Sequence, residues 1–280
     1  MKLALFGINF GPCADPAVAI RVAQAAEAAG LESLWTGEHV VLPDPQVPPS
    51  PSAPDTPFLD PAVSLAFIAG ATQTIRLGTG IIILPQRNPV VLAKELASLD
   101  VVSNGRLIFG IGVGYLKPEF DAIGASFDHK GARTIDYLQA MLALWTKAKP
   151  EYEGRFARFS GIQAMPRPVQ KPHPPIVIGG YTPEAFRRAV GYANGWYGFA
   201  QDVDATARCL DGLREAGTKV ERPEVLGDLE ISITPAAKLD ADTVKRYADL
   251  GVDRLIVSRR ATNPSEALQA VDRIHALAAS

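Results

Sequence analysis

Short apolar runs alternate with longer segments of helical periodicity along the whole chain. There are eight apolar runs, at residues 3–8, 32–37, 76–83, 106–112, 175–180, 195–200, 229–234 and 253–258. Strands that alternate with helices form a parallel sheet covered by helices, and eight such units favour closure into a barrel. We therefore expect an α/β fold, a (β/α)₈ TIM barrel formed by a single domain over residues 1–280, with an open doubly wound sheet as the alternative.

The starts of several helices are marked by a capping residue followed by proline. The pairs are Asp15-Pro16, Asp60-Pro61, Asn88-Pro89, Thr182-Pro183 and Asn263-Pro264. A capping side chain accepts a hydrogen bond from a free N–H group of the first turn. Proline at the first helical position lacks only an N–H group that would have no partner there. The five pairs predict helices that begin at these prolines.

Two long segments interrupt the alternation of strands and helices. Residues 40–58 are rich in proline and cannot form the interior of a helix or strand. Residues 147–174 contain aromatic residues around Gly154-Arg155, a pattern that indicates a small hairpin. Loops of this length in a compact domain are usually lids or binding walls. We expect extra loops after the second strand and before the fifth, with plain surface covering as the alternative for each.

Composition narrows the possible classes of function. The net charge of −2 offers no electrostatic reason to bind nucleic acid or a membrane surface. The two cysteines, Cys13 and Cys209, lie far apart and suit a reducing compartment better than a disulfide framework. No apolar stretch is long enough to span a bilayer. We expect a cytoplasmic protein that binds a small molecule and neither nucleic acid nor a membrane.

An acidic residue and a histidine follow the second predicted strand, as Glu38 and His39. In a barrel, catalytic groups come from the carboxyl ends of the strands. A carboxyl group beside an imidazole can donate or accept a proton, or polarise a bound ring. We expect Glu38 and His39 to be catalytic because the proline-rich loop follows them directly. The alternative is a solvated Glu38 and a hydrogen-bonded, structural His39.

Glycines recur at alternate positions of the third and fourth predicted strands. They are Gly78 and Gly80 on the third, and Gly110, Gly112 and Gly114 on the fourth. Residues two apart share one face of a strand, and a strand glycine often marks the close approach of a ligand or another backbone. Two such strand ends would form a flat, open wall that suits a planar tricyclic ring. The alternative is tight barrel packing or a bulge. The spacing does not match the G-x-G-x-x-G dinucleotide fingerprint.

Anion binding is predicted after the fifth strand. Gly179 and Gly180 end that strand, and Thr182 precedes the proline that opens a helix. Exposed amides, a hydroxyl group and a helix N-terminus can bind a phosphate. An ordinary capped helix start is the alternative.

Three further residues are weaker candidates for the cavity. Asn9 ends the first strand, Arg87 follows the third and Tyr115 follows the fourth. Arg87 could meet an anionic substrate. His129 and His173 have no Glu or Cys at metal-ligand spacing, so we expect no metal.

Five segments, taken in order, resemble the bacterial luciferase-like superfamily, and most closely its branch of coenzyme F420-dependent oxidoreductases. They are W-T-G-E-H-V-V-L-P, R-L-G-T-G-I-I-I-L-P, N-P-V-V-L-A-K-E-L-A-S-L-D, G-R-L-I-F-G-I-G-V-G and R-P-V-Q-K-P-H-P-P-I-V-I-G-G. The resemblance is clearest over residues 1–200. It implies a (β/α)₈ barrel with extra loops, and usually a homodimer.

The resemblance also implies roles for individual residues. The cofactor ring is expected against a bulge after the third strand, with a non-proline cis peptide bond between Gly80 and Ile81. His39 matches the family's active-site histidine. Glu38 stands where relatives often have Asp, and Tyr115 where the sugar-phosphate dehydrogenases of the group carry a catalytic Glu, which argues against a sugar-phosphate substrate. The residues expected to bind the cofactor are Asn9, Thr79, Gly80, Ile81, Gly112, Val113, Gly114, Gly179, Gly180 and Thr182.

Together these features lead to the hypothesis of hydride transfer between coenzyme F420 and a small organic substrate bound under residues 40–58. Arg87 and Tyr115 are the expected substrate contacts. F420 has carbon where flavin has N5, so it carries hydride, and the protein supplies orientation and a dry cavity. The alternative is an FMN-dependent two-component monooxygenase with a separate reductase. A cofactor-binding barrel without catalysis is a third reading.

Overall fold

In the computed structural model, which describes residues 1–258 and 261–278, parallel strands close into an eight-position barrel. The strands are β1 (Lys2–Phe6), β2 (Ser33–Thr36), β3 (Arg76–Thr79) continued by β4 (Ile82–Ile83), β5 (Leu107–Gly112), β8 (Ile176–Gly179), β9 (Gly195–Gln201), β10 (Glu230–Pro235) and β11 (Arg254–Ser258). The pairing order is β3-β2-β1-β11-β10-β9-β8-β5, and β3 pairs with β5 to close the ring. The predicted TIM barrel is confirmed, and each apolar run coincides with one strand position.

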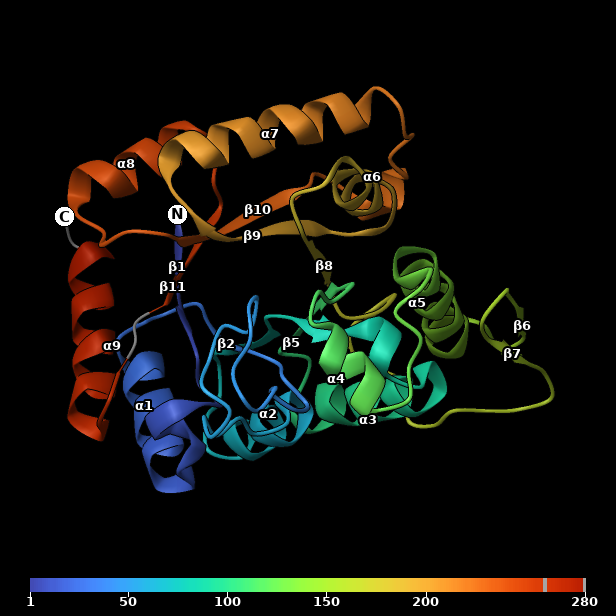
Figure 1. Ribbon diagram of the computed structural model, residues 1–280, viewed down its shortest axis with the longest axis horizontal. Coiled ribbons are helices and arrows are strands. Elements are labelled where there is room, and N and C mark those ends of the chain that lie inside the picture. Colours follow the sequence, from blue (N-terminus) through green and yellow to red (C-terminus); the bar gives the residue numbers. More distant parts are fainter. Residues whose placement is uncertain (259–260, 279–280) are drawn as a thin grey trace.

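Helices cover the outside of this barrel (Figure 1). They are α1 (Pro16–Ala28), α2 (Pro61–Ala69), α3 (Pro89–Val102), α5 (Lys130–Thr146), α6 (Pro183–Tyr192), α7 (Val203–Gly217), α8 (Ala241–Asp249) and α9 (Pro264–Ala278), with the short α4 (Lys117–Ala122) and the 3₁₀ turns η1 (Gly11–Ala14), η2 (Leu84–Gln86) and η3 (Glu224–Leu226). Asp15, Asp60 and Asn88 each accept bonds from two N–H groups of the turn that follows. Thr182 and Asn263 cap α6 and α9, and each accepts a bond from one N–H group of the first turn. All five predicted helix starts are confirmed.

A small apolar cluster fills the inside of the barrel, separate from the larger core between strands and helices. Its members are Ala4, Trp35, Ile108, Val177, Tyr197 and Ile256. Trp35 is fully buried, and its indole N–H donates to the hydroxyl of Ser33 over 2.8 Å. A Cβ atom at Gly78 would lie 2.5 Å from the Trp35 ring. Glycine at position 78 therefore makes room for a protein side chain, and not for a ligand.

The amino-terminal end of the barrel is closed by a buried ion cluster around Arg254. The guanidinium of Arg254 forms two hydrogen bonds of 2.8 Å with the carboxylate of Glu32, and it also pairs with Glu230. A third contact of 2.9 Å joins it to the hydroxyl of Ser232. Buried charges are tolerated when they are paired in this way. The open end of the barrel is therefore the carboxyl end.

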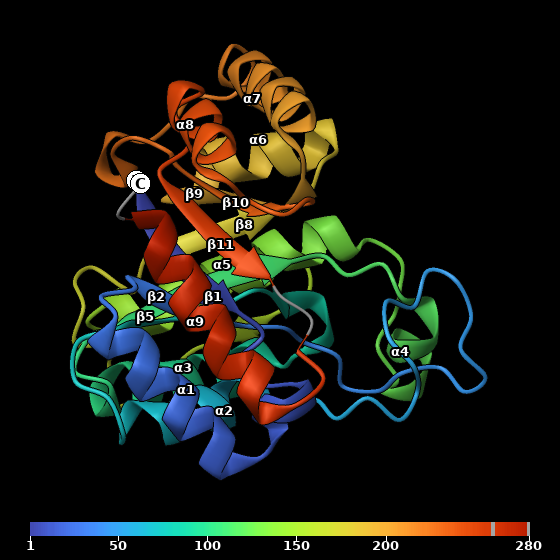
Figure 2. The same ribbon diagram turned by 90° about the vertical axis from the view of Figure 1, so that its left-hand side faces the viewer.

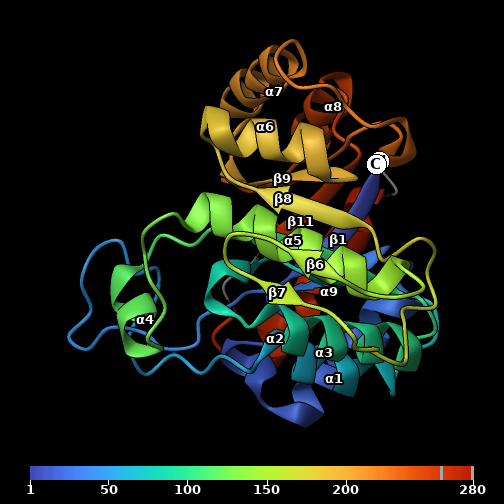
Figure 3. The same cartoon turned by 90° about the vertical axis from the view of Figure 1, so that its right-hand side faces the viewer.

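Two extra segments lie outside the regular pattern, as the sequence predicted. Residues 37–60 join β2 to α2, and they lie beside α4 on the side toward which the arrow of β11 points (Figures 2 and 3). Between α5 and β8, the strands β6 (Tyr152–Glu153) and β7 (Arg158–Phe159) form the predicted hairpin. The carboxylate of Asp136 on α5 accepts three backbone N–H bonds from the hairpin turn. Among the described helices, none has the length and apolar character needed to cross a bilayer.

Candidate functional site

The end of β2 places Glu38 in a buried chain of charges. Its carboxylate accepts hydrogen bonds from the backbone N–H of Ile83 and from the guanidinium of Arg87. Arg87 also pairs with Asp60 over 2.8 Å. The side chain of Glu38 is 1% exposed. Burial raises the pKa of Glu38, and the positive charge of Arg87 offsets only part of that rise.

These contacts leave Glu38 and Arg87 little freedom to act on a bound molecule. Both carboxylate oxygens of Glu38 already have protein donors, and Arg87 is directed at two carboxylates. The arrangement favours a structural role, in which the pair ties the end of β2 to the start of α3 and to the cap of α2. The predicted roles of Glu38 in catalysis and of Arg87 in substrate binding stay predictions, and these contacts do not support them.

His39 lies beside a carboxylate that the sequence analysis missed. Nδ1 of His39 is 3.6 Å from Oε1 of Glu119, whose side chain is fully buried, while the His39 side chain is 9% exposed. Within the described residues, this nitrogen has no hydrogen-bond partner. Buried polar atoms without partners are uncommon in folded proteins and point to a functional or ligand-binding role. His39 is therefore a candidate to meet a bound molecule, and Oγ1 of Thr36, at the end of β2, is buried without a described partner in the same way.

Aromatic rings surround the imidazole of His39. The ring of Phe58 lies 5.5 Å away and the ring of Tyr115 lies 6.3 Å away, both in edge-on geometry. Tyr115 is 50% exposed. Burial of its ring and the nearby charge of Glu119 raise the pKa of the Tyr115 hydroxyl. The structure thus brings together His39 and Tyr115, two of the predicted site residues, with Glu119 as an unpredicted third.

The only local feature of the sequence that could mark Glu119 as a site residue is its position in α4, after the fourth predicted strand and beside the buried Phe120. A glutamate in the first turn of a helix is ordinarily a solvated residue that favours the helix dipole. Its burial depends on contacts with the backbone N–H of Val40, at 2.5 Å, and with the side chain of Gln86, at 3.2 Å. These partners are far away in sequence, so the pattern of the chain alone could not identify them.

The predicted open wall of glycines is wrong. A Cβ atom at Gly110 would lie 1.9 Å from the carbonyl oxygen of Thr79, and one at Gly112 would lie 2.1 Å from Cδ1 of Ile81. At Gly114 it would meet Ile83 and Phe120 within 2.7 Å. These glycines permit close packing between strands and side chains, which was the alternative interpretation. The glycine pattern therefore gives no support to a bound flat ring.

The bulge after β3 fills the space beside the strand glycines. The peptide bond between Gly80 and Ile81 is cis, as the resemblance implied. The half-buried side chain of Ile81 packs against the cluster inside the barrel and also lies close to Gly179. Ile81, and not a bare strand face, therefore covers this part of the barrel interior.

Two predicted cofactor residues are used by the protein itself. The amide of Asn9 donates to the carbonyl oxygens of Gly37 and Leu59 and accepts from the N–H of Gly37. The hydroxyl of Thr79 bonds both the carbonyl and the N–H group of Gly110 at 2.8 Å. Both side chains are fully buried. They shape the mouth and present no free polar atom to a ligand.

The predicted anion site after β8 has the contacts of a capped helix start. The hydroxyl of Thr182 accepts from the N–H of Ala185 over 3.2 Å. Gly180 has a φ of +122°, and a Cβ atom there would lie 2.9 Å from Cβ of Ala185. The carbonyl oxygen of Gly180 accepts from the indole of Trp196. The phosphate-binding role of Gly179, Gly180 and Thr182 stays a prediction.

Two cations near this helix form no direct ion pair with the described residues, although Glu184 lies close enough to Arg188 to raise its pKa in part. The Nε atom of Arg188 on α6 is buried without a hydrogen-bond partner, and its guanidinium lies next to Gly131. The ammonium of Lys130 donates to the carbonyl oxygen of Gly114 over 2.7 Å, beside the half-buried Val113. Burial lowers the pKa of both cations. An anionic group at this end of the barrel would meet positive charge.

Comparison with known proteins places this geometry in a family context. The model of the family described as luciferase-like monooxygenase matches residues 7–278. The chain is 31% identical over 272 residues to an uncharacterised protein of Mycobacterium tuberculosis (strain ATCC 25618 / H37Rv), with 93% of each chain covered. It is also 34% identical over 173 residues to the oxygenase component of a flavin-dependent trigonelline monooxygenase of Acinetobacter baylyi (strain ATCC 33305 / BD413 / ADP1), covering 61% of this chain and 45% of that protein.

A solved structure shows the same fold. An F420-dependent secondary alcohol dehydrogenase, in complex with an F420–acetone adduct, superposes with a TM-score of 0.77 at 14% identity, covering 98% of this chain and 97% of that one. Similar proteins thus include both F420-dependent and flavin-dependent enzymes. Since the family model spans nearly the whole sequence, this chain belongs to the luciferase-like monooxygenase family.

Proposed function

We propose that this chain is an oxidoreductase that binds coenzyme F420 at the carboxyl ends of its barrel strands and transfers hydride between the coenzyme and a small organic substrate. Membership of the luciferase-like family supports the redox chemistry. The deazaflavin would supply the hydride, as cofactors supply the difficult chemistry in such enzymes. The protein would supply binding, orientation and a proton.

The observation that carries this proposal is the largely buried imidazole of His39, whose Nδ1 faces the carboxylate of Glu119 at 3.6 Å. Transfer of hydride to a carbonyl carbon leaves an oxygen atom that needs a proton, and the reverse reaction needs a base. An imidazole can do both near neutral pH, and an adjacent carboxylate stabilises its protonated form. His39 would therefore hold the proton, and Glu119 would orient the ring.

Other residues of the mouth would hold the coenzyme. Ile81 would support the cofactor ring, because its side chain covers the barrel interior beside the glycines, which have no side chains of their own. Lys130 and Arg188 would attract the anionic part of the coenzyme. Neither assignment depends on the glycine wall that the structure excludes.

Binding of the two cofactors tests the proposal directly. The purified protein is titrated with oxidised F420 and, separately, with FMN, and cofactor fluorescence is followed. We expect saturable binding of F420 that weakens in the Arg188→Gln variant and at raised ionic strength, because a charged contact is screened by salt. Binding of FMN with no binding of F420 would contradict the proposal.

FMN-dependent monooxygenation is a second candidate. The observation that favours it is the 34% identity to the oxygenase component of a flavin-dependent monooxygenase. This candidate requires reduced FMN from a separate reductase, and oxygen as a second substrate. Oxygen consumption that depends on reduced FMN and on an organic substrate would establish it in place of hydride transfer.

A further inference from the structure

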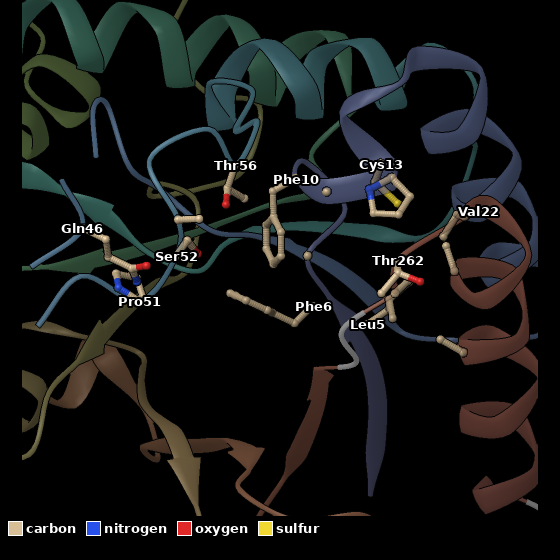
Figure 4. A pocket seen from close by; sticks show the side chains of 17 residues that line it. Leu5, Phe6, Phe10, Cys13, Val22, Gln46, Pro51, Ser52, Thr56 and Thr262 are labelled. Carbon is tan, nitrogen blue, oxygen red and sulfur yellow. The ribbon is translucent and has the colours of Figure 1, made fainter. Parts of the chain in front are cut away.

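A cavity of about 410 Å³ lies beside the barrel mouth, beneath the loop that follows β2 (Figure 4). Its wall is formed by the end of β1, by η1, by Val22 of α1, by loop residues between 46 and 56, and by residues between 261 and 270. We name it the η1 cavity. Small-molecule sites commonly have volumes of roughly 300–1,000 Å³. The η1 cavity is therefore large enough for an organic ligand.

Among the residues that the structure describes, the wall of the η1 cavity carries no charged side chain. None of the 17 described residues that line it is Asp, Glu, Lys or Arg, although these make up 21% of the chain. Its inner end is formed by Val22, Ala267 and Ala270, which are at most 5% exposed. An ionised group at this end would lose its hydration shell without gaining a charged or hydrogen-bonding partner. That desolvation costs roughly several kcal/mol. The described part of the wall therefore offers an ionised ligand no partner of opposite charge.

Most polar side chains of the cavity lie toward the loop side, apart from Thr262, whose hydroxyl already donates to the carboxylate of Glu266. Gln46, Ser52 and Thr56 line it there, and Figure 4 shows them away from Cys13 and Val22. Within the described chain, the hydroxyl groups of Ser52 and Thr56 take part in no hydrogen bond with another residue. A ligand with an apolar arm and one polar group would match this division.

A short series of aromatic rings joins the η1 cavity to His39. Phe10, in the cavity wall, lies 4.9 Å from the ring of Phe58, measured between centroids. Phe58 in turn lies 5.5 Å from His39. Phe6, also in the wall, packs against the cluster inside the barrel. A molecule in the cavity would thus be separated from His39 by the rings of Phe10 and Phe58.

From these contacts we propose that the η1 cavity binds the apolar arm of the substrate, and that the substrate is an uncharged, mainly apolar molecule with a polar group toward residues 46–56. This inference rests on the proposed function only in that the bound molecule is taken to be the substrate of the redox reaction. Binding in the cavity does not require a cofactor, so it can be tested without one.

Cys13 offers a reporter inside the cavity. It lines the wall, and burial raises the pKa of its thiol to about 11. In a Cys209→Ala background it is the remaining cysteine of the chain. The rate of alkylation of Cys13 by N-ethylmaleimide at alkaline pH is measured alone, with 2-decanone, and with decanoate, which has the same chain length and a negative charge. We expect 2-decanone to slow the reaction about tenfold, and decanoate to have little effect.

A matched pair of variants locates the binding. Ala270→Leu fills the inner end of the cavity, whereas Ala276→Leu makes the same change at an exposed position of the same helix. The affinity for 2-decanone, measured by calorimetry, should fall about tenfold in the first variant and stay unchanged in the second. If Ala270→Leu does not fold, Ala53→Trp on the exposed loop narrows the cavity from outside and should have the same effect.

Three results would overturn the inference: protection of Cys13 by decanoate as strong as that by 2-decanone, no protection by 2-decanone, or affinity for 2-decanone that the cavity variants leave unchanged. Because these assays contain no cofactor, their failure is distinct from failure of the proposed redox function. Conversely, protection by 2-decanone in a protein that binds neither F420 nor FMN would support the cavity inference while removing the proposed function.

Discussion

The carboxylate of Glu119 lies 3.6 Å from Nδ1 of His39, although the two residues belong to different βα units of the barrel. The same carboxylate accepts hydrogen bonds from the backbone of Val40 and the side chain of Gln86, so it is held from several directions. Catalytic hydrogen bonds are often long in proteins without ligand and shorten when the complex forms. Glu119 is thus suited to orient His39, as a positioning residue.

Replacement of Glu119 by Gln tests this relationship. The amide keeps the shape but loses the charge that stabilises a protonated imidazole, so we expect kcat to fall roughly tenfold, about 1.4 kcal/mol. The KM for the substrate and the affinity for the cofactor should change little, so that the loss falls on kcat. Glu119→Asp, which keeps the charge, should recover part of the activity. A kcat in Glu119→Gln equal to that of the unchanged protein would reduce Glu119 to a structural contact.

Replacement of His39 by Ala tests the proton-transfer role directly. A positioned acid or base contributes a factor of roughly 10² to 10⁴ to the rate, and we expect a loss of that size in kcat. Circular dichroism and cofactor titration should match those of the unchanged protein, because Nδ1 of His39 has no hydrogen-bond partner among the described residues. Turnover equal to that of the unchanged protein would remove His39 from the mechanism.

The ion pair of Arg87 and Glu38 should affect stability more than chemistry. Arg87→Met leaves a buried carboxylate without its cation, and loss of one partner of a buried pair typically costs about 3–5 kcal/mol. We expect the free energy of unfolding to fall by an amount of that order at neutral pH, measured by denaturant titration. The Arg87→Met, Glu38→Gln double variant should recover most of the loss.

The pH dependence of that loss has a definite sign. Burial already raises the pKa of Glu38, and removal of the Arg87 charge raises it further. A group with a raised pKa in the folded state contributes stability at pH values below its ordinary pKa, and loses this contribution as pH rises through the folded value. The deficit of Arg87→Met should therefore shrink as pH falls toward 4.5, the ordinary value. A deficit that grows on acidification would contradict this account of the pair.

The fold could be predicted from the sequence because its determinants are local. An apolar run specifies a buried strand wherever it occurs, and a cap such as Asp15 fixes the start of a helix through N–H groups two and three residues away. His39 was identified for the same reason, since it directly follows a strand. The apolar runs, the helix caps and the position of His39 can be identified without knowing which distant residues contact them in the fold.

The rest of the site depends on distant partners. Glu119 is buried because it bonds Val40, which is 79 positions away. Whether a glycine face is open or filled depends on the next strand: Thr79 fills the space beside Gly110, and Ile81 fills that beside Gly112. The periodicity of residues along a strand shows which of them share a face, but it does not show which residues of other segments pack against that face.

The contact between Gly112 and Ile81 gives a test of this packing that needs no cofactor. Gly112→Ala would place a methyl group 2.1 Å from Cδ1 of Ile81, and inserting a methyl group into a packed core typically costs about 1–3 kcal/mol. Ile81→Val removes that Cδ1 atom, so the double variant should be more stable than Gly112→Ala alone. Denaturant unfolding of the single and double variants measures the coupling between the two residues. If the Gly112→Ala variant loses no stability but binds cofactor less well, position 112 faces a ligand and not Ile81, and the open wall that the sequence predicted would be restored.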